Sequence, residues 1–527
     1  MNRKPPLLIE VMTRRQKLFF YTLFFLLLGF TVYFWVWWLN PNHLVGKIGF
    51  ALNSALIAWN MLMPVYFFFF AAKMKKPNPQ LAVSDGLKVA MIVTKVQSES
   101  FEIVKKTLSA MLSQKYPHDT WLADEDPTEE VIAWCRQNKV FVSTRKGVAE
   151  YHRDTWPRKK KCKEGNLAYF YDQWGYDKYD FVAQMDADHV PEIGYLEEML
   201  RPFADPKVGY VSAPSICDAN ADKSWVARAR LYAEATLHGP LQAGYNAGWA
   251  PLCIGSHYAV RTKALKEIGG LGPELAEDFS TSLLMNAYKW KGVHALDAHA
   301  HGDGPLTFTD FATQEYQWSK SLATILFTLT NKYWVKLKFK LKIQFMFLQL
   351  FYPLYGFSML FAYLTPASAI ISGVPLANVG YIEFLLHLLP LSLISLALIG
   401  LIIKNRFTRP QNYSIFSWEL FMFHFIRWPW VVLGTSAAFF GVLKNRQNEI
   451  RITPKGYIAN EKLPFKIVFP YLAISLISAL VAILPLNHTY IKGYYYFALL
   501  NSTFYLIVLS IIFTTFLRQR DKLYVRK

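Results

Sequence analysis

Long apolar runs at both ends of the chain enclose a central region with a different pattern. The first run ends at about Leu39, and the second covers about Ile48–Ala72. Each is long enough for a membrane span, which needs about 20 apolar residues. The first also exceeds the apolar core of a signal peptide and lacks a small-residue cleavage site, so it predicts a retained span. Four more spans are predicted over residues 343–364, 378–403, 465–486 and 493–517.

Basic residues lie beside these runs, for example Arg14, Lys73 and Lys404, and in the tail from Arg518 to Lys527. The positive-inside rule therefore predicts a multi-pass protein of the plasma (inner) membrane, with both termini and the central region in the cytosol. Composition supports this, because 53% of residues are hydrophobic although the net charge is +19. A nucleic-acid-binding protein is also basic, but its Lys and Arg should not flank apolar runs, so no nucleic-acid partner is expected.

The apolar stretch within residues 411–443 does not fit a simple span. Pro429 interrupts it, with Arg427 at one end and Lys444 at the other. Cations at both ends place both ends on the cytosolic side, so we predict an interfacial or re-entrant segment. Six spans, an even number, also keep both termini on the same side.

The central region, residues 85–304, alternates short β-rich runs with helical stretches. The order is "KVAMIV", "FEIVKKTLSAML", "DTWLAD", "TEEVIAWCRQN" and "VFVS", and "YDFVAQM" is a later strand. This rhythm predicts a mostly parallel sheet covered by helices. Binding sites in such sheets gather at the carboxyl ends of the strands.

Several acidic and polar clusters are weak signals when each is taken alone. "DADH", with Asp186 and Asp188, supplies the oxygen donors that Mg²⁺ or Mn²⁺ prefers, but for this motif alone a polar turn after a strand is the favoured explanation. "AEDF", with Asp278, is also a good helix start. Asp124 can simply belong to a loop, and the "QEYQW" of residues 314–318 can be one face of an amphipathic helix.

The order of these clusters is more informative than any one of them. A strand ending in Asp124 is followed by "KEGN" (163–166), "DADH", the loop "CIGSHYAVR", the Glu-Asp pair and Gln-x-x-x-Trp before the later spans. This order resembles the membrane-integrated family-2 glycosyltransferases, in particular the cellulose synthase and hyaluronan synthase-like group with its D, DxD, (T)ED, QxxRW signature. The resemblance extends from about Lys88 to Trp318 and to the flanking spans. In addition, "EIRITPKG" (449–456) resembles the gating-loop motif of bacterial cellulose synthases.

The resemblance implies an α/β GT-A (Rossmann-like) cytosolic glycosyltransferase domain inserted in an α-helical transmembrane bundle. It assigns catalysis to Asp278, as the general base, and to Glu277. It assigns the metal, Mg²⁺ or Mn²⁺, to Asp188 and Asp186. Nucleotide-sugar binding is assigned to Asp124, Lys163, Asn166, Asp186 and Gln314. Acceptor binding is assigned to Trp318, Gly255 and Ser256.

The chemistry of glycosyl transfer with inversion agrees with these roles. A direct displacement at the anomeric carbon needs a base to take the proton of the acceptor hydroxyl. It also needs positive charge to stabilise the leaving diphosphate, which a divalent ion supplies. The acids therefore have two separate tasks, one at the metal and one at the proton.

Three positions depart from the family pattern. Gln317 stands where the QxxRW motif has Arg, so Lys320 or another cation must substitute or donor handling differs. Ala276 replaces the Thr of TED, which leaves the acid pair intact. The stretch "TKVQSES" (94–100) differs from the family's motif after the first strand, so the nucleotide contacts there are open.

We therefore expect two spans in residues 1–84, the GT-A domain in 85–304, interfacial amphipathic helices with the QxxxW motif in 305–342, and spans in 343–527. Within the last part, 411–443 is the interfacial segment and 444–460 a gating-like loop. The predicted activity is that of an inverting, processive glycosyltransferase that polymerises a β-linked polysaccharide from a nucleotide sugar, with UDP-hexose favoured, and translocates it.

The expected partners are the nucleotide sugar donor, the growing glycan acceptor and membrane lipids. A non-processive enzyme that adds one sugar to a lipid acceptor is the alternative, which Gln317 keeps open. A transporter without catalysis would need more charged residues within the spans. Aromatic residues at span ends are ordinary interface belts, but four could instead stack on sugar rings: Trp318, Tyr352, Tyr355 and Trp428.

Overall fold

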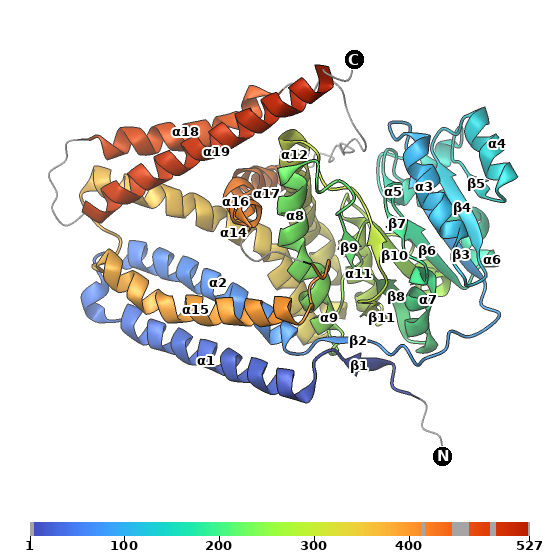
Figure 1. Ribbon diagram of the computed structural model, residues 1–527, viewed down its shortest axis with the longest axis horizontal. Coiled ribbons are helices and arrows are strands. Elements are labelled where there is room, and N and C mark those ends of the chain that lie inside the picture. Colours follow the sequence, from blue (N-terminus) through green and yellow to red (C-terminus); the bar gives the residue numbers. More distant parts are fainter. Residues whose placement is uncertain (1–4, 413–416, 445–462, 485–491, 525–527) are drawn as a thin grey trace.

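The computed structural model describes residues 5–412, 417–444, 463–484 and 492–524. An α/β domain occupies one side of the molecule and a bundle of long helices the other (Figure 1). Two helices, α8 (Trp225–Thr236) and α12 (Phe308–Ile325), lie between the sheet and the bundle. The gating-like stretch expected over 444–460 lies, except for Lys444, outside the described residues.

The α/β domain is built on a seven-stranded sheet with the order β11-β8-β10-β6-β3-β4-β5. Its strands are β3 (Val89–Lys95), β4 (Asp119–Asp124), β5 (Phe141–Ser143), β6 (Phe181–Met185), β8 (Val208–Ser212), β10 (His257–Arg261) and β11 (Lys291–His294). The β3, β4, β5 and β6 strands run parallel, whereas β10 is antiparallel to β6 and β8. The prediction of a mostly parallel sheet is confirmed, with one antiparallel strand in its middle.

A second, three-stranded sheet has the order β7-β12-β9. Its strands are β7 (Val190–Pro191), β9 (Ser215–Ile216) and β12 (Ala300–His301). Its strand β7 is the next strand after β6 in the chain, so this small sheet holds the end of the turn that follows β6.

Helices cover both faces of the main sheet. They are α3 (Phe101–Leu112), α4 (Glu129–Gln137), α5 (Lys163–Phe170), α7 (Tyr195–Leu200), α10 (Thr262–Glu267) and α11 (Glu277–Ala287). Alternate residues of β3 point to opposite faces, as strand geometry requires. Met91 packs in the core beneath α3, α4 and α7, and Ile92 packs in the core beneath α5 and α11. The core beneath α5 and α11 continues into the bundle, because it also contains Phe345 of a bundle helix.

Seven helical segments among the described residues are long and apolar enough to cross a membrane. Six are single helices: α1 (Arg14–Trp38), α2 (Lys47–Ala71), α14 (Phe339–Ser372), α15 (Tyr381–Lys404), α18 (Phe465–Ala482) and α19 (Lys492–Tyr524). Large apolar side chains on them face outward, including Leu18, Val36 and Ile48 at 72–80% exposure. Such exposure in water would be costly, so it fits lipid contact and supports a membrane protein.

The seventh segment, Trp418–Leu443, differs from the others. It consists of α16 (Trp418–Ile426) and α17 (Trp428–Leu443), which meet at Arg427. Half of the residues in its most apolar stretch are buried inside the protein, compared with 17–33% in the corresponding stretches of the other six segments. It lies where the bundle meets the α/β domain (Figure 1).

A short ribbon places the two ends of the α1–α2 pair together. The β1 strand (Leu8–Glu10) precedes α1, and β2 (Lys75–Pro77) follows α2; the two strands pair in antiparallel fashion. Lys76 forms an ion pair with Asp297 of the α/β domain at 2.8 Å. Residues before α1 and after α2 therefore lie on the α/β side of the bundle.

Candidate active site

Asp124 lies at the carboxyl end of β4, where the strand pattern predicted it. Its side chain is fully buried, and its two oxygens lie 3.1 and 3.3 Å from Lys95 Nζ at the end of the neighbouring β3. Asn166 on α5 donates to the Ala123 carbonyl oxygen at 2.9 Å, which attaches α5 to the same strand end. The side-chain oxygen of Asn166 has no hydrogen-bond partner among the described residues, so it is available to a ligand.

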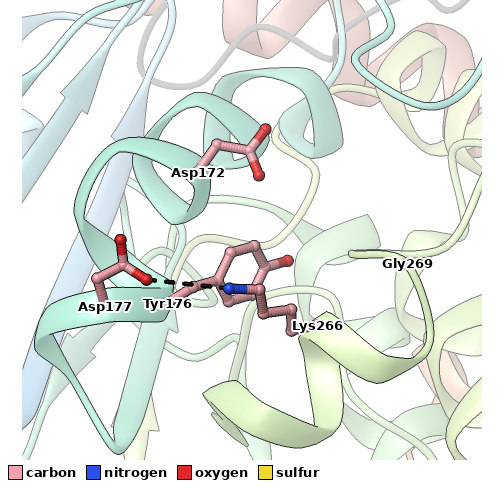
Figure 2. A pocket seen from close by; sticks show the side chains of 5 residues that line it. All are labelled: Asp172, Tyr176, Asp177, Lys266 and Gly269. Atoms are coloured by element: carbon pink, nitrogen blue, oxygen red, sulfur yellow. Dashed lines mark ion pairs between the residues drawn. The ribbon is translucent and has the colours of Figure 1, made fainter.

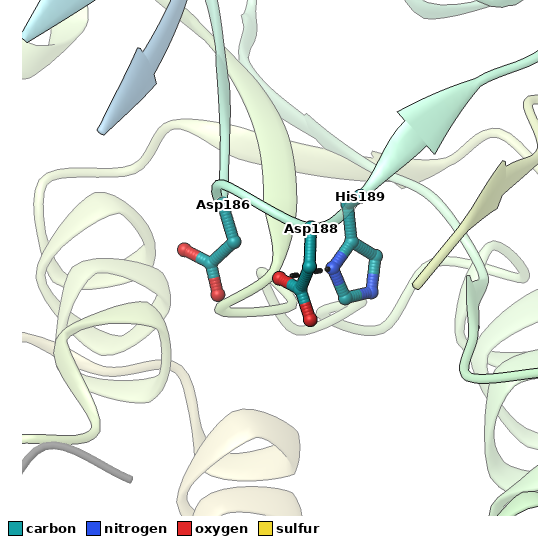
Figure 3. Close-up of side chains that lie close together, drawn as sticks. All are labelled: Asp186, Asp188 and His189. Carbon is teal, nitrogen blue, oxygen red and sulfur yellow. Dashed lines mark hydrogen bonds and ion pairs between the residues drawn. The ribbon is translucent and has the colours of Figure 1, made fainter. Parts of the chain in front are cut away.

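Asp186 and Asp188 project from the turn after β6, and their carboxylates lie side by side (Figure 3). With His189 they form a cluster whose donor atoms all lie within 4.8 Å of one another. Both ring nitrogens of His189 have protein partners, Asp188 Oδ1 at 3.3 Å and Ser215 Oγ at 3.0 Å. His189 thus orients Asp188. Burial lowers the pKa of His189, but the Asp188 carboxylate outweighs this and raises it to about 10.

Lys163, the first residue of α5, joins several predicted residues. Its Nζ donates to Asp186 Oδ1 at 2.8 Å and to the Gly255 carbonyl oxygen at 2.6 Å. Ser256 accepts a backbone hydrogen bond from Asp186 at 2.7 Å, and its hydroxyl contacts His257 at 3.0 Å. The Gly-Ser loop is therefore part of the support around Asp186.

Gly255 also borders the predicted base. A Cβ atom at this position would lie 3.1 Å from Asp278 Oδ2, so the loop approaches the carboxylate as closely as a glycine allows. Asp278 and Glu277 form the first turn of α11, and Asp278 Oδ1 accepts from the Phe279 amide at 2.7 Å. One Glu277 oxygen, Oε1, is buried without a hydrogen-bond partner among the described residues.

The two adjacent acids have unusual titration behaviour. Burial raises the pKa of Glu277 to about 8; Lys163 opposes this shift, and the Asp278 and Asp186 carboxylates add to it. Burial also raises the pKa of Asp278, while backbone amides and Lys163 act in the opposite direction. Raised carboxyl pKa values in a polar site are typical of proton-transfer residues.

The QxxxW motif lies on α12, which contacts both other parts of the molecule. Ser321 Oγ accepts from the Ala276 amide at 3.0 Å, next to the acid pair. On another side of the helix, Gly434 of α17 packs so closely that a Cβ atom there would lie 2.2 Å from Ser319 Oγ.

Gln314 and Trp318 are partly exposed, and both contact Arg230 of α8. Arg230 Nη1 donates to Gln314 Oε1 at 2.6 Å, and its guanidinium carbon lies 4.2 Å from the Trp318 ring centre.

Three charged partners of the predicted residues were not found from the sequence. Lys95 pairs with Asp124, and Arg230 contacts the QxxxW motif. Arg427, at the junction of α16 and α17, forms an ion pair with Glu315 at 2.7 Å, and both side chains are buried. Lys95 could have been noticed because it lies two residues after the predicted strand "KVAMIV" (88–93). The two arginines could not, since each lies more than 80 positions from its partner.

Two surface hollows lie away from these residues. One, of about 290 Å³, is lined by Asp172, Tyr176, Asp177, Lys266 and Gly269 (Figure 2). The other, of about 330 Å³, extends to Lys88 and Asp180. Lys88 and Asp180 directly precede β3 and β6, so the hollows are at the opposite edge of the sheet from Asp124 and Asp186.

The residues at the carboxyl edge fit a divalent cation. Asp186 and Asp188 offer hard oxygen donors close together, as Mg²⁺ and Mn²⁺ prefer. Lys163 and Arg230 are cations that could meet an anionic ligand, and Asp278 is a carboxylate able to accept a proton. The combination suits a reaction that binds a phosphate-bearing donor and removes a proton from an acceptor.

A comparison with protein families agrees with this arrangement. Residues 181–442, from β6 to α17, match the family "Glycosyl transferase family group 2". The chain therefore contains a family-2 glycosyltransferase domain, and the predicted GT-A class of fold is confirmed.

Curated relatives are similar at low identity. The chain is 23% identical over 389 residues to the cellulose synthase catalytic subunit [UDP-forming] of Pseudomonas fluorescens (strain SBW25), which covers 72% of this chain and 49% of the relative. It is 24% identical over 289 residues to cellulose synthase 1 catalytic subunit [UDP-forming] of Komagataeibacter xylinus, covering 53% of this chain and 37% of the relative. The chain thus spans half or less of the length of these relatives.

Solved structures that match part of this chain include the mannosyltransferase PcManGT from Pyrobaculum calidifontis in complex with GDP-Man and Mn²⁺. That similarity has a TM-score of 0.47 and 13% identity, and it covers 75% of this chain and 98% of the other. Glucosyl-3-phosphoglycerate synthase from Mycobacterium tuberculosis, in complex with Mn²⁺, UDP-Glc and phosphoglyceric acid, gives a TM-score of 0.28 at 16% identity, covering 42% and 74%.

Proposed function

We propose that this protein is an inverting, processive hexosyltransferase that polymerises a β-linked polysaccharide from a nucleotide sugar and translocates the product through its own helices. The observation that carries the proposal is the position of α12. This helix contacts Ala276 beside the acid pair through Ser321 and packs against α17 of the bundle at Gly434. A product formed at Asp278 would therefore emerge beside the bundle.

The side chains divide the chemistry as follows. Asp278 accepts the proton of the acceptor hydroxyl, and the close approach of Gly255 helps to position its carboxylate. Glu277, protonated near neutral pH, adds no second negative charge at the reacting centre. Asp188 and Asp186 would hold Mg²⁺ or Mn²⁺, which supplies positive charge for the diphosphate. Asp124, Asn166 and Gln314 bind the nucleotide sugar, while Trp318 borders the acceptor.

The donor is proposed to be a UDP-hexose, because the curated relatives are named as UDP-forming synthases. The proposed acceptor is the growing glycan. Trp318 is the aromatic residue best placed to stack on it. Trp428 is instead stacked on Tyr363 and donates to the Tyr505 hydroxyl at 2.8 Å, so its partners are within the bundle.

We also propose six spans with both termini and the α/β domain in the cytosol of a cell with a plasma (inner) membrane. The pairing of β1 with β2 supports an even number of crossings for α1 and α2. The α16–α17 segment remains interfacial in this proposal. Near its start, Glu419 pairs with Arg228 of α8 at 2.9 Å, and near its end Phe439 contacts Phe327.

The test is a transfer assay with purified protein in Mn²⁺. Labelled UDP-glucose, UDP-N-acetylglucosamine, UDP-glucuronate and GDP-mannose are supplied separately, and the product is sized. A long polymer from one donor is the expected result. No transfer from any donor, with nucleotide binding also absent, would overturn the proposal.

A second function has one observation in its favour. Gln317 replaces the Arg of the family motif, and a changed motif at the acceptor is compatible with a single transfer to a lipid. In the same assay, a lipid that carries one sugar would select this alternative over the polymerase.

A further inference from the structure

Arg230 of α8 brings a positive charge to the part of α12 where Gln317 replaces the Arg of the family motif. The motif residues that this chain retains are Gln314 and Trp318, and the residue between them that differs is Gln317. Arg230 contacts both retained residues, through a 2.6 Å hydrogen bond to Gln314 and by stacking 4.2 Å from the Trp318 ring centre. A positive charge is thus present at the motif, but it comes from a residue 84 positions earlier.

The surroundings of Arg230 keep it charged and leave part of it uncommitted. Its Nε donates to Glu234 at 3.1 Å, and Glu234 also faces His238 at 3.7 Å. Burial acts to lower the pKa of Arg230, but Glu234 and Cys217 outweigh it and the pKa is raised. A guanidinium has five N–H donors, of which two have partners within the described part of the chain, and Nη2 has none there.

The helix of Arg230 also lies beside the metal-binding turn. Gly304 packs so closely against Ala227 of α8, one turn before Arg230, that a Cβ atom on this glycine would lie 3.0 Å from Ala227 Cβ. The neighbouring Asp303 amide donates to Asp188 Oδ2 at 3.3 Å. The other cations near the site are bound to its acidic residues. Lys163 is bound to Asp186 and the Gly255 carbonyl, and Lys95 is paired with the buried Asp124.

We propose that Arg230 binds the diphosphate of the nucleotide donor and of the leaving nucleoside diphosphate, and so supplies from α8 the charge that Gln317 does not provide. Guanidinium groups suit this task because their planar N–H pairs match phosphate oxygens. The stack on Trp318 fixes the orientation of the group. This assignment rests on the proposed glycosyltransferase function.

The experiment measures binding in place of turnover. Purified full-length protein in detergent with Mn²⁺ is titrated calorimetrically with UDP, GDP and inorganic pyrophosphate. We expect Arg230→Gln to weaken the binding of pyrophosphate and of the preferred nucleoside diphosphate at least tenfold. Arg230→Lys should have a smaller effect, because it keeps the charge and loses only the paired donors.

Two further variants separate a direct role from a structural one. The double variant Arg230→Gln/Gln317→Arg should recover most of the affinity, since it returns the cation to the motif from α12. Arg228→Gln is the matched control: Arg228 lies on the same helix and pairs with Glu419 at 2.9 Å, and this variant should bind pyrophosphate like the wild type.

The outcomes distinguish this inference from the function on which it rests. Wild-type protein that binds neither nucleoside diphosphate nor pyrophosphate would overturn both. Wild-type binding with equal affinity in Arg230→Gln would overturn only the assignment of Arg230. Equal loss in Arg230→Gln and Arg228→Gln, without recovery in the double variant, would show that α8 acts only as a structural support.

Discussion

The carboxyl edge of the sheet and the α12 helix both contribute to the site, but they are held in different ways. At the sheet edge, Asp124 and Asp186 follow strands that pair with the same neighbour, β3, so backbone hydrogen bonds bring them near each other. On α12, the side chains of Gln314 and Glu315 are held by single charged residues from distant helices, Arg230 and Arg427.

This difference has consequences for robustness. The sheet edge is fixed by many backbone hydrogen bonds, so changing a side chain there that is not in the buried Lys95–Asp124 or Asp188–His189 pair should alter chemistry and leave the fold intact. The α12 helix depends on a buried ion pair, and removing one partner of such a pair leaves an uncompensated charge. Changes on α12 should therefore affect stability and function together. Four predictions test this contrast.

The largest effect is expected from Asp278→Asn at the sheet side of the site. The amide cannot take the acceptor's proton, so transfer should fall by roughly 10²–10⁴-fold while nucleotide binding survives. Radiolabelled sugar transfer and calorimetric nucleotide binding measure the two effects. Asp177→Asn, an acid at the opposite edge of the sheet, is the matched control and should transfer normally. Full activity in Asp278→Asn would remove Asp278 from the role of base.

On α12, Glu315→Ala should lower the free energy of unfolding by about 3–5 kcal/mol, because Arg427 is left buried and unpaired. The shift in thermal unfolding midpoint in detergent measures this. Replacing both partners, Glu315→Leu with Arg427→Met, should recover much of the loss. Glu102→Ala breaks an exposed pair with Lys105 and should cost less than about 1 kcal/mol. Equal shifts for Glu315→Ala and Glu102→Ala would contradict the contrast between the two regions.

Back at the sheet edge, Asp188→Ala should weaken Mn²⁺-dependent donor binding by at least about tenfold, since loss even of a group that supports a metal ligand costs 10- to 100-fold. Because Asp188 also pairs with the buried His189, the unfolding midpoint is measured alongside, to separate a loss of stability from a loss of binding. Nucleotide titration at several Mn²⁺ concentrations measures the effect, with Asp177→Ala as control. An unchanged dependence on Mn²⁺ would argue against Asp188 as a ligand.

The smallest effect concerns pH. A base must be ionised to act, and burial raises the pKa of Asp278, so transfer should decline as pH falls through this raised value and not at the ordinary carboxyl range. Burial also raises the pKa of Glu277 to about 8, so Glu277 is mostly protonated at pH 7. Glu277→Gln should therefore retain more activity at pH 7 than Asp278→Asn. A pH–rate profile of both variants tests this, and equal losses would mean that both acids act as bases.

Much of the architecture could be predicted because the signals are local. Short apolar, β-rich runs identified strands such as Phe181–Met185, and the strand-end rule directed attention to Asp186 and Asp188. Asp278 and Glu277 begin a helix, as the acidic pair before an apolar run suggested. The roles of Gly255 and Ser256 were predicted only as acceptor contacts, whereas the structure places them against Asp278 and Asp186.

The sequence by itself determined which segments are apolar enough to enter a membrane, where the strands end and which acids stand there, because these properties depend on neighbours within a few residues. The tertiary structure alone decided which charges meet. Arg230 reaches Gln314 across 84 positions and Arg427 reaches Glu315 across 112, and no periodicity records such distances. Those contacts exist because α8 and α17 pack on α12, and that packing follows from the whole set of buried surfaces.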